Sequence, residues 1–514
     1  MRFDRVVKLC AELVLLFAVS GSAVASELAE LIETGQRREA IELIQSGAEV
    51  NEAQGDGTTP LHWAVYGVDL ELTTLLLEHG ADPNVRNAFG SDPLGEAIRV
   101  AAEDIVRLLL DAGADATTTN VDGQTSLMLA ARAGSTEVAR LLIEQGVDVN
   151  AREAWRNQSA LIWAADARQP EIVDLLIEHG AEIDFRAASI DWPSQITSEP
   201  RAQYRPVGGL TPLLYAARSG CTACVRSIVA AGADIDRPTP EGMTPLMIAI
   251  DNEALDTALM LLELGANPHV WDWYGRTALY VAADKSQVGR GRANDNGPSG
   301  LDLMRRLLEA GVDPNPQLNM HRPSRGGNIG RFIDDLLTTG CTPLLRVASS
   351  QDLEAVHLLL ANGADVDLPN IMGVTPLMAV AGTGGSRGGI RSTNFGSESR
   401  AIQLLEVLVA AGADVNARIV DEYDRTGTIG RASSMTDRQG QSSLFAAVTL
   451  GWVDVVEFLV RNGADVTVTD MRGISLADIA LDQAAAAEAA DDLQRVDYWE
   501  GLAARLRELG TEVD

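Results

Sequence analysis

Residues 59 to 64 read Thr-Pro-Leu-His-Trp-Ala, and variants of this stretch return along the whole chain. The leucine of the motif recurs at intervals that begin with 33, 33 and 34 residues. Its positions are Leu61, Leu94, Leu127, Leu161, Leu213, Leu246, Leu279, Leu344, Leu377, Leu444 and Leu476. A glycine before a small apolar residue marks the same period at Gly47, Gly80, Gly113, Gly146, Gly180, Gly232, Gly265, Gly311, Gly363, Gly412 and Gly463. Two markers in one register indicate a repeat architecture, in which neighbouring units cover each other's apolar faces.

Each unit is predicted to be a helix-turn-helix followed by a hairpin. Thr59 is typical of a helix N-cap, and Pro60 fits the first helical turn. The leucine run 75–77 supplies the apolar stripe of a second helix, which Gly80 ends in a left-handed cap. Asp82 then begins a turn toward the next unit.

These residues resemble the ankyrin repeat, whose 33-residue period and Thr-Pro-Leu-His-x-Ala motif appear nearly intact at residues 59–64. The resemblance extends from about residue 26 to the C-terminus. It departs from the family pattern where apolar residues, among them Met128 and Leu214, replace the histidine that His62 retains. The resemblance implies an all-α solenoid of about eleven helix-turn-helix units with β-hairpin loops. It also implies a curved groove that binds a protein partner through its concave and hairpin surface, without enzyme activity.

Five long insertions interrupt the period, three in hairpin connections and two between paired helices. The expected organisation is a signal peptide at 1–25, a capping repeat at 26–54, repeats at 55–185, an insertion at 186–207, repeats at 208–315 with an insertion at 285–299, an insertion at 316–338, repeats at 339–417 with an insertion at 385–399, an insertion at 418–438, repeats at 439–483 and a C-terminal cap at 484–514.

The first 25 residues have the layout of a secretory signal peptide: basic residues, an apolar run and Ala23-Val24-Ala25. The apolar run is about 12 residues, and a membrane-spanning helix needs roughly 20. An uncleaved anchor is the alternative, and Glu12 at the start of the run disfavours it. We expect a protein exported to the periplasm or the extracellular space of a bacterium, not inserted in the membrane after removal of the signal.

Charge argues against nucleic acid as a partner. The chain carries a net charge of −32, and the part after residue 25 carries −33, whereas phosphate binding needs a basic surface. Arginine is concentrated in the insertions, which carry +5 and leave −38 on the repeats. A monomeric chain with a protein partner is the expectation.

A candidate binding site is the predicted hairpin Trp271-Asp272-Trp273-Tyr274, because tryptophan, tyrosine and arginine dominate binding hot spots. The insertions could add arginines to this site, namely Arg205, Arg290, Arg325, Arg331 and Arg391. Together they predict a platform for a partner or, as an alternative function, a receptor for a small anionic or sugar-like ligand. The opposing interpretation is that the rings pack beneath the insertions and the arginines pair with the acidic repeats.

Cys221 and Cys224 follow Gly220 at the start of a predicted second helix. A structural disulfide or two packed small side chains is favoured over a redox dithiol, since the repeat offers no strand-to-helix context for one. A redox enzyme using this pair is the third hypothesis. Zinc-ligand spacing, a phosphate loop, a dinucleotide fingerprint and a serine elbow are all absent from the sequence. We therefore expect no catalytic residues, no metal and no cofactor.

Overall fold

The computed structural model describes residues 27–191, 206–287, 297–319, 339–383, 397–420, 439–470 and 473–512. It divides into two compact units. Unit 1 comprises Met1–Ser189 and Gly208–Asp234, and unit 2 comprises Ile190–Val207 and Ile235–Asp514. The predicted Arg205, Arg290, Arg325, Arg331 and Arg391 all lie outside the described residues.

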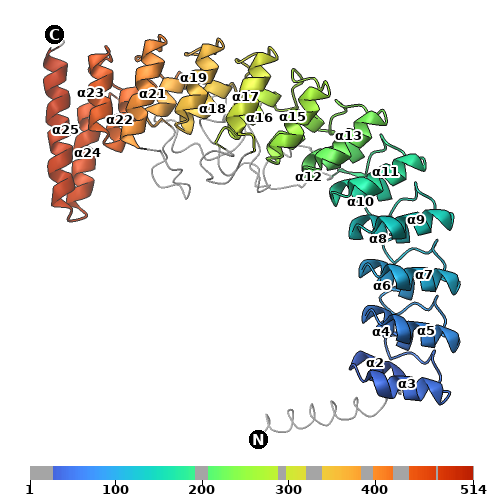
Figure 1. The fold of residues 1–514 in the computed structure, drawn as a ribbon. Coiled ribbons are helices and arrows are strands. Elements are labelled where there is room, and N and C mark those ends of the chain that lie inside the picture. The colour runs from blue at the N-terminus through green and yellow to red at the C-terminus, as the bar shows by residue number, and fades with distance from the viewer. Residues whose placement is uncertain are drawn as a thin grey trace, which may run out of the picture. The chain divides into compact units, whose positions relative to one another are not determined.

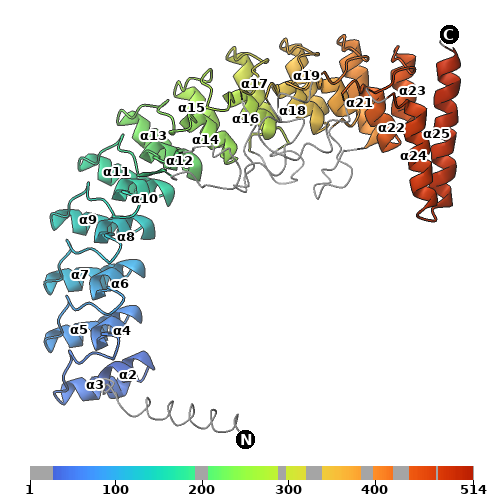
Figure 2. The same ribbon diagram turned by 180° about the vertical axis from the view of Figure 1, so that it is seen from behind.

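Unit 1 is a stack of helix pairs in two layers (Figure 1, Figure 2). Its first helices are α2 (Glu27–Glu33), α4 (Pro60–Tyr66), α6 (Pro93–Arg99), α8 (Ser126–Ala133), α10 (Ala160–Asp166) and α12 (Pro212–Ser219). Its second helices are α3 (Arg37–Gln45), α5 (Leu70–Glu78), α7 (Glu103–Asp111), α9 (Thr136–Glu144), α11 (Pro170–Glu178) and α13 (Thr222–Ala230). Within the unit, each helix contacts its own partner, and each also contacts the equivalent helix of the neighbouring repeat. The predicted all-α ankyrin-type solenoid is confirmed.

Unit 2 repeats this arrangement. Its first helices are α14 (Pro245–Asp251), α16 (Ala278–Asp284), α18 (Pro343–Ser349), α20 (Pro376–Val380), α22 (Ser443–Leu450) and α24 (Leu476–Glu488). Its second helices are α15 (Leu255–Glu263), α17 (Gly300–Glu309), α19 (Leu353–Ala361), α21 (Glu398–Ala410), α23 (Val453–Arg461) and α25 (Leu493–Glu512). The expected start of the cap at residue 484 falls inside α24, because an alanine-rich run continues that helix.

The helices begin and end where local chemistry predicts. The Thr211 hydroxyl accepts a hydrogen bond from the Leu214 backbone N–H at 3.3 Å, and Pro212 occupies the first turn. Gly80, just after the C-cap of α5, has φ +86, a conformation that glycine adopts without a steric penalty. The repeated leucines, such as Leu61 and Leu127, are 1% and 0% exposed between the layers. Full burial of one such side chain stabilises the fold by about 1.5–3 kcal/mol.

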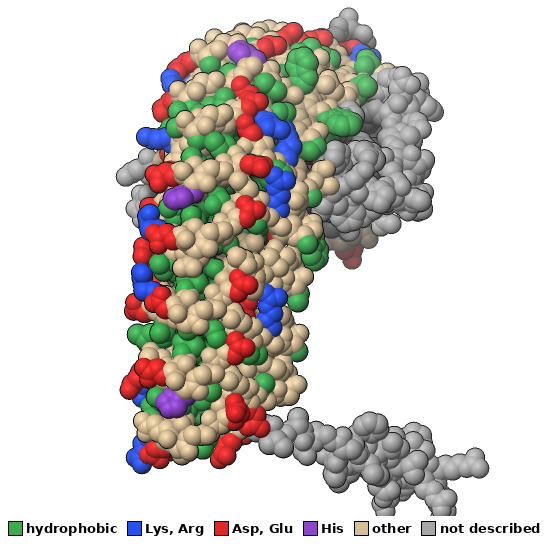
Figure 3. Space-filling view, turned by 90° about the vertical axis from the view of Figure 1, so that its right-hand side faces the viewer, with side chains coloured by type: hydrophobic (Ala, Val, Ile, Leu, Met, Phe, Trp, Pro, Cys, Tyr) green, Lys and Arg blue, Asp and Glu red, His purple; other side chains and the backbone are tan. Residues whose placement is uncertain are grey.

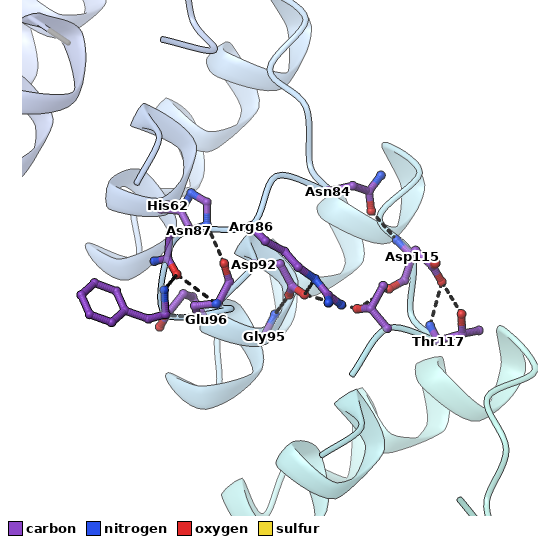
Figure 4. Close-up of polar contacts among 12 residues, drawn as sticks. His62, Asn84, Arg86, Asn87, Asp92, Gly95, Glu96, Asp115 and Thr117 are labelled. Carbon is purple, nitrogen blue, oxygen red and sulfur yellow. Dashed lines mark hydrogen bonds and ion pairs between the residues drawn. The ribbon is translucent and has the colours of Figure 1, made fainter. Parts of the chain in front are cut away.

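Neighbouring repeats are joined by side-chain amides (Figure 4). The Asn84 side chain donates to the Gly113 carbonyl at 3.1 Å and accepts from the Asp115 backbone N–H at 2.8 Å. Equivalent pairs of bonds are made by Asn51, Asn150, Asn315 and Asn416. We call these positions the asparagine ladder. Aspartate takes the same position at Asp184, Asp236 and Asp367, where the carboxylate accepts a backbone N–H of the next repeat.

The retained histidine also joins two repeats. His62 Nδ1 accepts from the Thr59 backbone N–H at 3.2 Å, and Nε2 donates to the Ser91 carbonyl of the next hairpin at 3.1 Å. Burial lowers the pKa of His62 below the usual histidine value, so the neutral ring is the form that fits.

Among the described residues, four connections contain a single antiparallel bridge. Three of these close short hairpins, as between Trp271 and Thr277, and the fourth joins Arg418 and Ser442 on either side of an insertion. Two three-residue strands, β1 (Ser189–Asp191) and β2 (Pro206–Gly208), pair with each other. Among the described residues, no helix has the length and apolar character needed to cross a bilayer.

Candidate functional site

The predicted aromatic hairpin splits into two exposed and two buried side chains. Trp271 and Trp273 are 69% and 53% exposed, whereas Asp272 and Tyr274 are only 1% and 4% exposed. The four residues therefore do not form one platform. Trp271 and Trp273 remain available to a ligand or partner, and the other two side chains face the interior.

Asp272 is buried because it holds the turn together. Its Oδ1 accepts from the backbone N–H groups of Tyr274 at 3.0 Å and Arg276 at 2.9 Å. Its Oδ2 pairs with the Arg276 guanidinium at 2.6 Å, and both side chains are nearly inaccessible. Asn87 and Asn370 hold their own hairpins through the same two backbone contacts. Asp272 is thus a structural residue of the repeat, which corrects our expectation that it contributes to the binding surface.

In unit 1, three successive hairpins expose large apolar side chains at their tips. Phe89, Val121 and Trp155 are 72%, 77% and 75% exposed, and we call them the hairpin-tip row. A backbone bond joins the last two of these hairpins, where the Ala154 N–H donates to the Asp122 carbonyl at 3.1 Å. Contiguous exposed apolar patches mark interaction sites, so three large exposed apolar side chains on successive hairpins make this row a candidate interaction surface.

Aromatic side chains continue onto the outward side of the first helices of unit 1, which we call the first-helix face. On α4, Trp63 and Tyr66 lie three residues apart and contact edge to face, with ring centroids 6.0 Å apart. The Trp63 indole N–H donates to Gln54 of the preceding hairpin at 2.9 Å. Tyr66 is 63% exposed, so its ring is available for contact.

Arginines accompany the aromatic rings farther along this face. The Arg132 guanidinium lies 5.6 Å from the centre of the Trp163 ring, and that of Arg218 lies 4.5 Å from the centre of the Tyr215 ring. Arg218 also pairs with Asp166 at 2.7 Å. Burial raises the pKa of Tyr215, so its hydroxyl remains protonated at neutral pH.

Charge separates the two layers of unit 1. The five first helices α4, α6, α8, α10 and α12 carry two acidic and three arginine side chains. The five second helices α5, α7, α9, α11 and α13 carry ten acidic and three arginine side chains. Figure 3 looks onto the side of the second helices and shows acidic side chains along its margins, with apolar side chains between them. The first-helix face therefore lacks the strong negative charge of the second-helix face.

Cys221 and Cys224 form a disulfide, with their Cα atoms 5.2 Å apart. Both residues are buried, and the Cys221 sulfur accepts from the Cys224 N–H at the start of α13. This position suits a local structural link better than a redox centre, whose sulfur must be reached by a substrate. Cys341 is a buried thiol outside any disulfide, and its sulfur accepts from the Tyr280 hydroxyl at 3.4 Å. No potential metal-binding group of His, Cys, Asp and Glu occurs among the described residues.

The sequence indicated a concave and hairpin surface, but the residues of the first-helix face were not singled out. The signal that could have revealed them is the three-residue spacing of Trp63 and Tyr66, which alternates with the buried positions of α4. The same spacing relates Trp163 to Asp166 and Tyr215 to Arg218 in later repeats.

Comparisons with known proteins agree with this geometry. The family described as Ankyrin repeats (3 copies) matches residues 28–120, 114–187 and 195–272, and the family described as Ankyrin repeat matches residues 339–371 and 439–471. The chain is 30% identical over 262 residues to the B-cell lymphoma 3 protein homolog of Mus musculus, which covers 50% of this chain and 45% of that protein. It is 31% identical over 195 residues to the mouse neurogenic locus notch homolog protein 1, covering 33% of this chain and 7% of that protein.

The chain is also similar to part of a further relative and to one solved structure. The putative palmitoyltransferase ZDHHC13 of Danio rerio is 32% identical over 301 residues, covering 58% of this chain and 36% of that protein. The chain thus spans less than half the length of each of these relatives. The crystal structure of the human ASB11 ankyrin repeat domain is 24% identical, with a TM-score of 0.39, and covers 47% of this chain and 99% of its own.

Proposed function

Because the chain belongs to the ankyrin repeat family, we propose that it is an exported, non-enzymatic scaffold that binds a protein partner through the first-helix face and hairpin-tip row of unit 1. Ankyrin repeats generally mediate protein–protein interaction and generally are not enzymes, which supports a protein partner and a scaffold role. The signal-peptide pattern of residues 1–25 supports export to the periplasm or the outside of a bacterial cell.

The observation that carries the proposal is the chemical contrast between the two layers of unit 1. The first-helix face presents tryptophan, tyrosine and arginine, the residue types that contribute most to binding energy. The second helices present mainly carboxylates, which are depleted at the centres of interfaces. The exposed hairpin-tip row extends the first-helix face with three more apolar side chains. A protein partner that contacts both would bury aromatic anchors within a rim of charged groups.

A site-specific cross-linking experiment tests the proposed surface. A photoreactive phenylalanine analogue replaces Tyr66 or Phe89 in the full chain, and Leu70 on the second-helix face is the matched control because it is also exposed, at 42%. We expect one partner adduct from the exported fraction with the first two variants and not with the control. Equal adducts at all three positions, or adducts at the control alone, would reject the surface.

Trp271 and Trp273 support a second candidate function, a receptor for a small anionic or sugar-like ligand, because both rings are exposed on one hairpin of unit 2. The arginines expected to join them lie outside the described residues. The discriminating variant is Trp271→Ala with Trp273→Ala. A small ligand should raise the melting temperature of the wild type. If the variant loses this increase while cross-links at Tyr66 remain, the result would favour the receptor function at this hairpin.

A monomeric chain without nucleic acid binding remains part of the proposal, and the net charge of −32 supports the second point. Light scattering of the exported protein and a DNA mobility assay at low salt measure the two properties directly.

A further inference from the structure

The repeat built on α10 contains two buried polar atoms without a hydrogen-bond partner among the described residues. They are the Ser159 hydroxyl oxygen and the Trp163 indole nitrogen. Ser159 precedes α10 and is 5% exposed, but its side chain makes no cap hydrogen bond. At the same position in other repeats, Thr125 and Thr211 accept backbone N–H groups. Buried polar groups are normally paired, so two orphans, one at the N-cap of α10 and one four residues later on the helix, indicate a missing partner.

One arginine lies over the Trp163 ring, and a second lies in the hairpin of the same repeat. They are Arg132 of the preceding repeat and Arg156 of the hairpin that leads into α10. Both arginines are exposed, and neither forms an ion pair with any carboxylate in the described part of the chain. Exposed guanidinium groups of this kind bind carboxylates in bidentate geometry.

The nearby carboxylates are already engaged. Glu153 accepts from the backbone N–H groups of Trp155, Arg156 and Gln158 at 2.6, 2.8 and 3.1 Å. Asp166 pairs with Arg218. The repeat built on α10 therefore combines two buried donors without a partner with two exposed guanidinium groups that form no ion pair with any described acid of unit 1.

We propose that Arg132, Arg156, Ser159 and Trp163, which we call the α10 site, bind the side-chain carboxylate of a glutamate or aspartate in the protein partner. One carboxylate oxygen accepts from the Trp163 and Ser159 donors once the exposed Arg132 side chain turns aside. The two guanidinium groups then close on the other oxygen. This inference rests on the proposed function and specifies the partner as a segment that presents an acidic residue to the first-helix face.

Exposed Trp155 extends the specificity of the site. It lies in the same hairpin as Arg156 and is 75% exposed, so an apolar residue beside the partner's acid has an aromatic surface to contact. The preferred partner segment therefore combines an acidic with an apolar or aromatic residue.

The test uses the indole N–H signals of the full chain in nitrogen-15 NMR spectra, with Trp163→Phe identifying the Trp163 signal. The probes are N-acetylglutamate, N-acetylglutamine and inorganic phosphate at constant ionic strength. We expect N-acetylglutamate to shift the Trp163 signal and N-acetylglutamine to leave it in place. Shifts of equal size from the two acetylated probes, a larger shift from phosphate, or none at the highest soluble concentration of N-acetylglutamate would overturn the assignment.

Variants locate the binding and separate this inference from the proposed function. Arg132→Gln and Arg156→Gln should each weaken N-acetylglutamate binding by about ten- to a hundredfold, the effect of losing one charge-assisted hydrogen bond. Arg107→Gln, on the second-helix face, is the control and should change nothing. Partner cross-links at Tyr66 without any response to N-acetylglutamate would reject the α10 site and leave the proposed function standing. Loss of those cross-links together with intact probe binding would reject the proposed function instead.

Discussion

Replacing Asp367 by asparagine should stabilise unit 2, because it completes the asparagine ladder at that repeat. Both carboxylate oxygens of Asp367 lie 3.0 Å from the Asp414 backbone nitrogen, and a carboxylate has no N–H for the Gly412 carbonyl. In the next repeat, Asn416 makes both contacts and donates to the Gly463 carbonyl at 2.9 Å. One added neutral hydrogen bond stabilises a protein by about 0.5–1.5 kcal/mol.

The gain should depend on pH. Burial, with the neighbouring charges of Asp414 and Asp365, raises the pKa of Asp367 above its ordinary value of 3.8. Stability from a group with a raised folded-state pKa is fully present below pH 3.8 and is lost as the pH rises through the folded pKa. Ionised Asp367 is therefore least favourable at neutral pH. The advantage of Asp367→Asn should be larger at pH 7 than near pH 4.

Hydrogen exchange of the full chain measures this change, because it reports the opening free energy of each repeat separately. Amides of 358–383 and 404–420 should be better protected in Asp367→Asn than in the wild type. Asn416→Asp makes the reverse change and should reduce protection, while Glu406→Gln on α21 controls for the loss of one exposed charge. Equal protection in Asp367→Asn and the wild type at pH 7, or an equal gain from Glu406→Gln, would refute the reasoning.

Three further outcomes are expected. Acidification below the usual histidine pKa of 6.5 should reduce hydrogen-exchange protection around His62. Burial lowers the pKa of His62 in the folded state, so the unfolded chain binds the proton more readily and is favoured at low pH. His62→Gln should abolish this pH dependence. Replacing Cys221 and Cys224 together by serine should cost no more than about 2 kcal/mol of local stability in hydrogen exchange, because the disulfide closes a very short loop. Gly242→Ala should lower the thermal midpoint, with a cost of ~1–3 kcal/mol, because Gly242 has φ +91 and its new Cβ would lie 3.1 Å from the Asp272 Cα atom.

The fold could be predicted because its determinants are local and periodic. Thr59 and Pro60 start a helix wherever their equivalents recur, and Gly80 ends the next one by its own conformational freedom. The buried leucines follow with the same spacing. The helix ends and the leucine spacing can both be predicted without knowing which residues contact each other in the folded chain.

The site was harder to predict because the residue types in a segment do not reveal which side chains point outward and which point inward. Asp272 lies between two tryptophans and looks like part of their surface, but its carboxylate turns inward to bind Arg276 and two backbone N–H groups. Trp163 belongs to a run of helix residues that resembles core, but its orphaned nitrogen appears only once its neighbours are in place. The insertions have no period, so no register relates Arg205 or Arg290 to the repeats.

The bonds between hairpin tips bear on how such a protein diversifies. Donor and acceptor both belong to the main chain, as between Ala88 and Asp56 at 2.7 Å, so a substitution at Phe89 or Trp155 leaves the connection intact. Single substitutions at the hairpin tips can therefore change which partner is bound without changing the backbone hydrogen bonds between repeats. Related chains should vary most at these tips and least at the amides of the asparagine ladder.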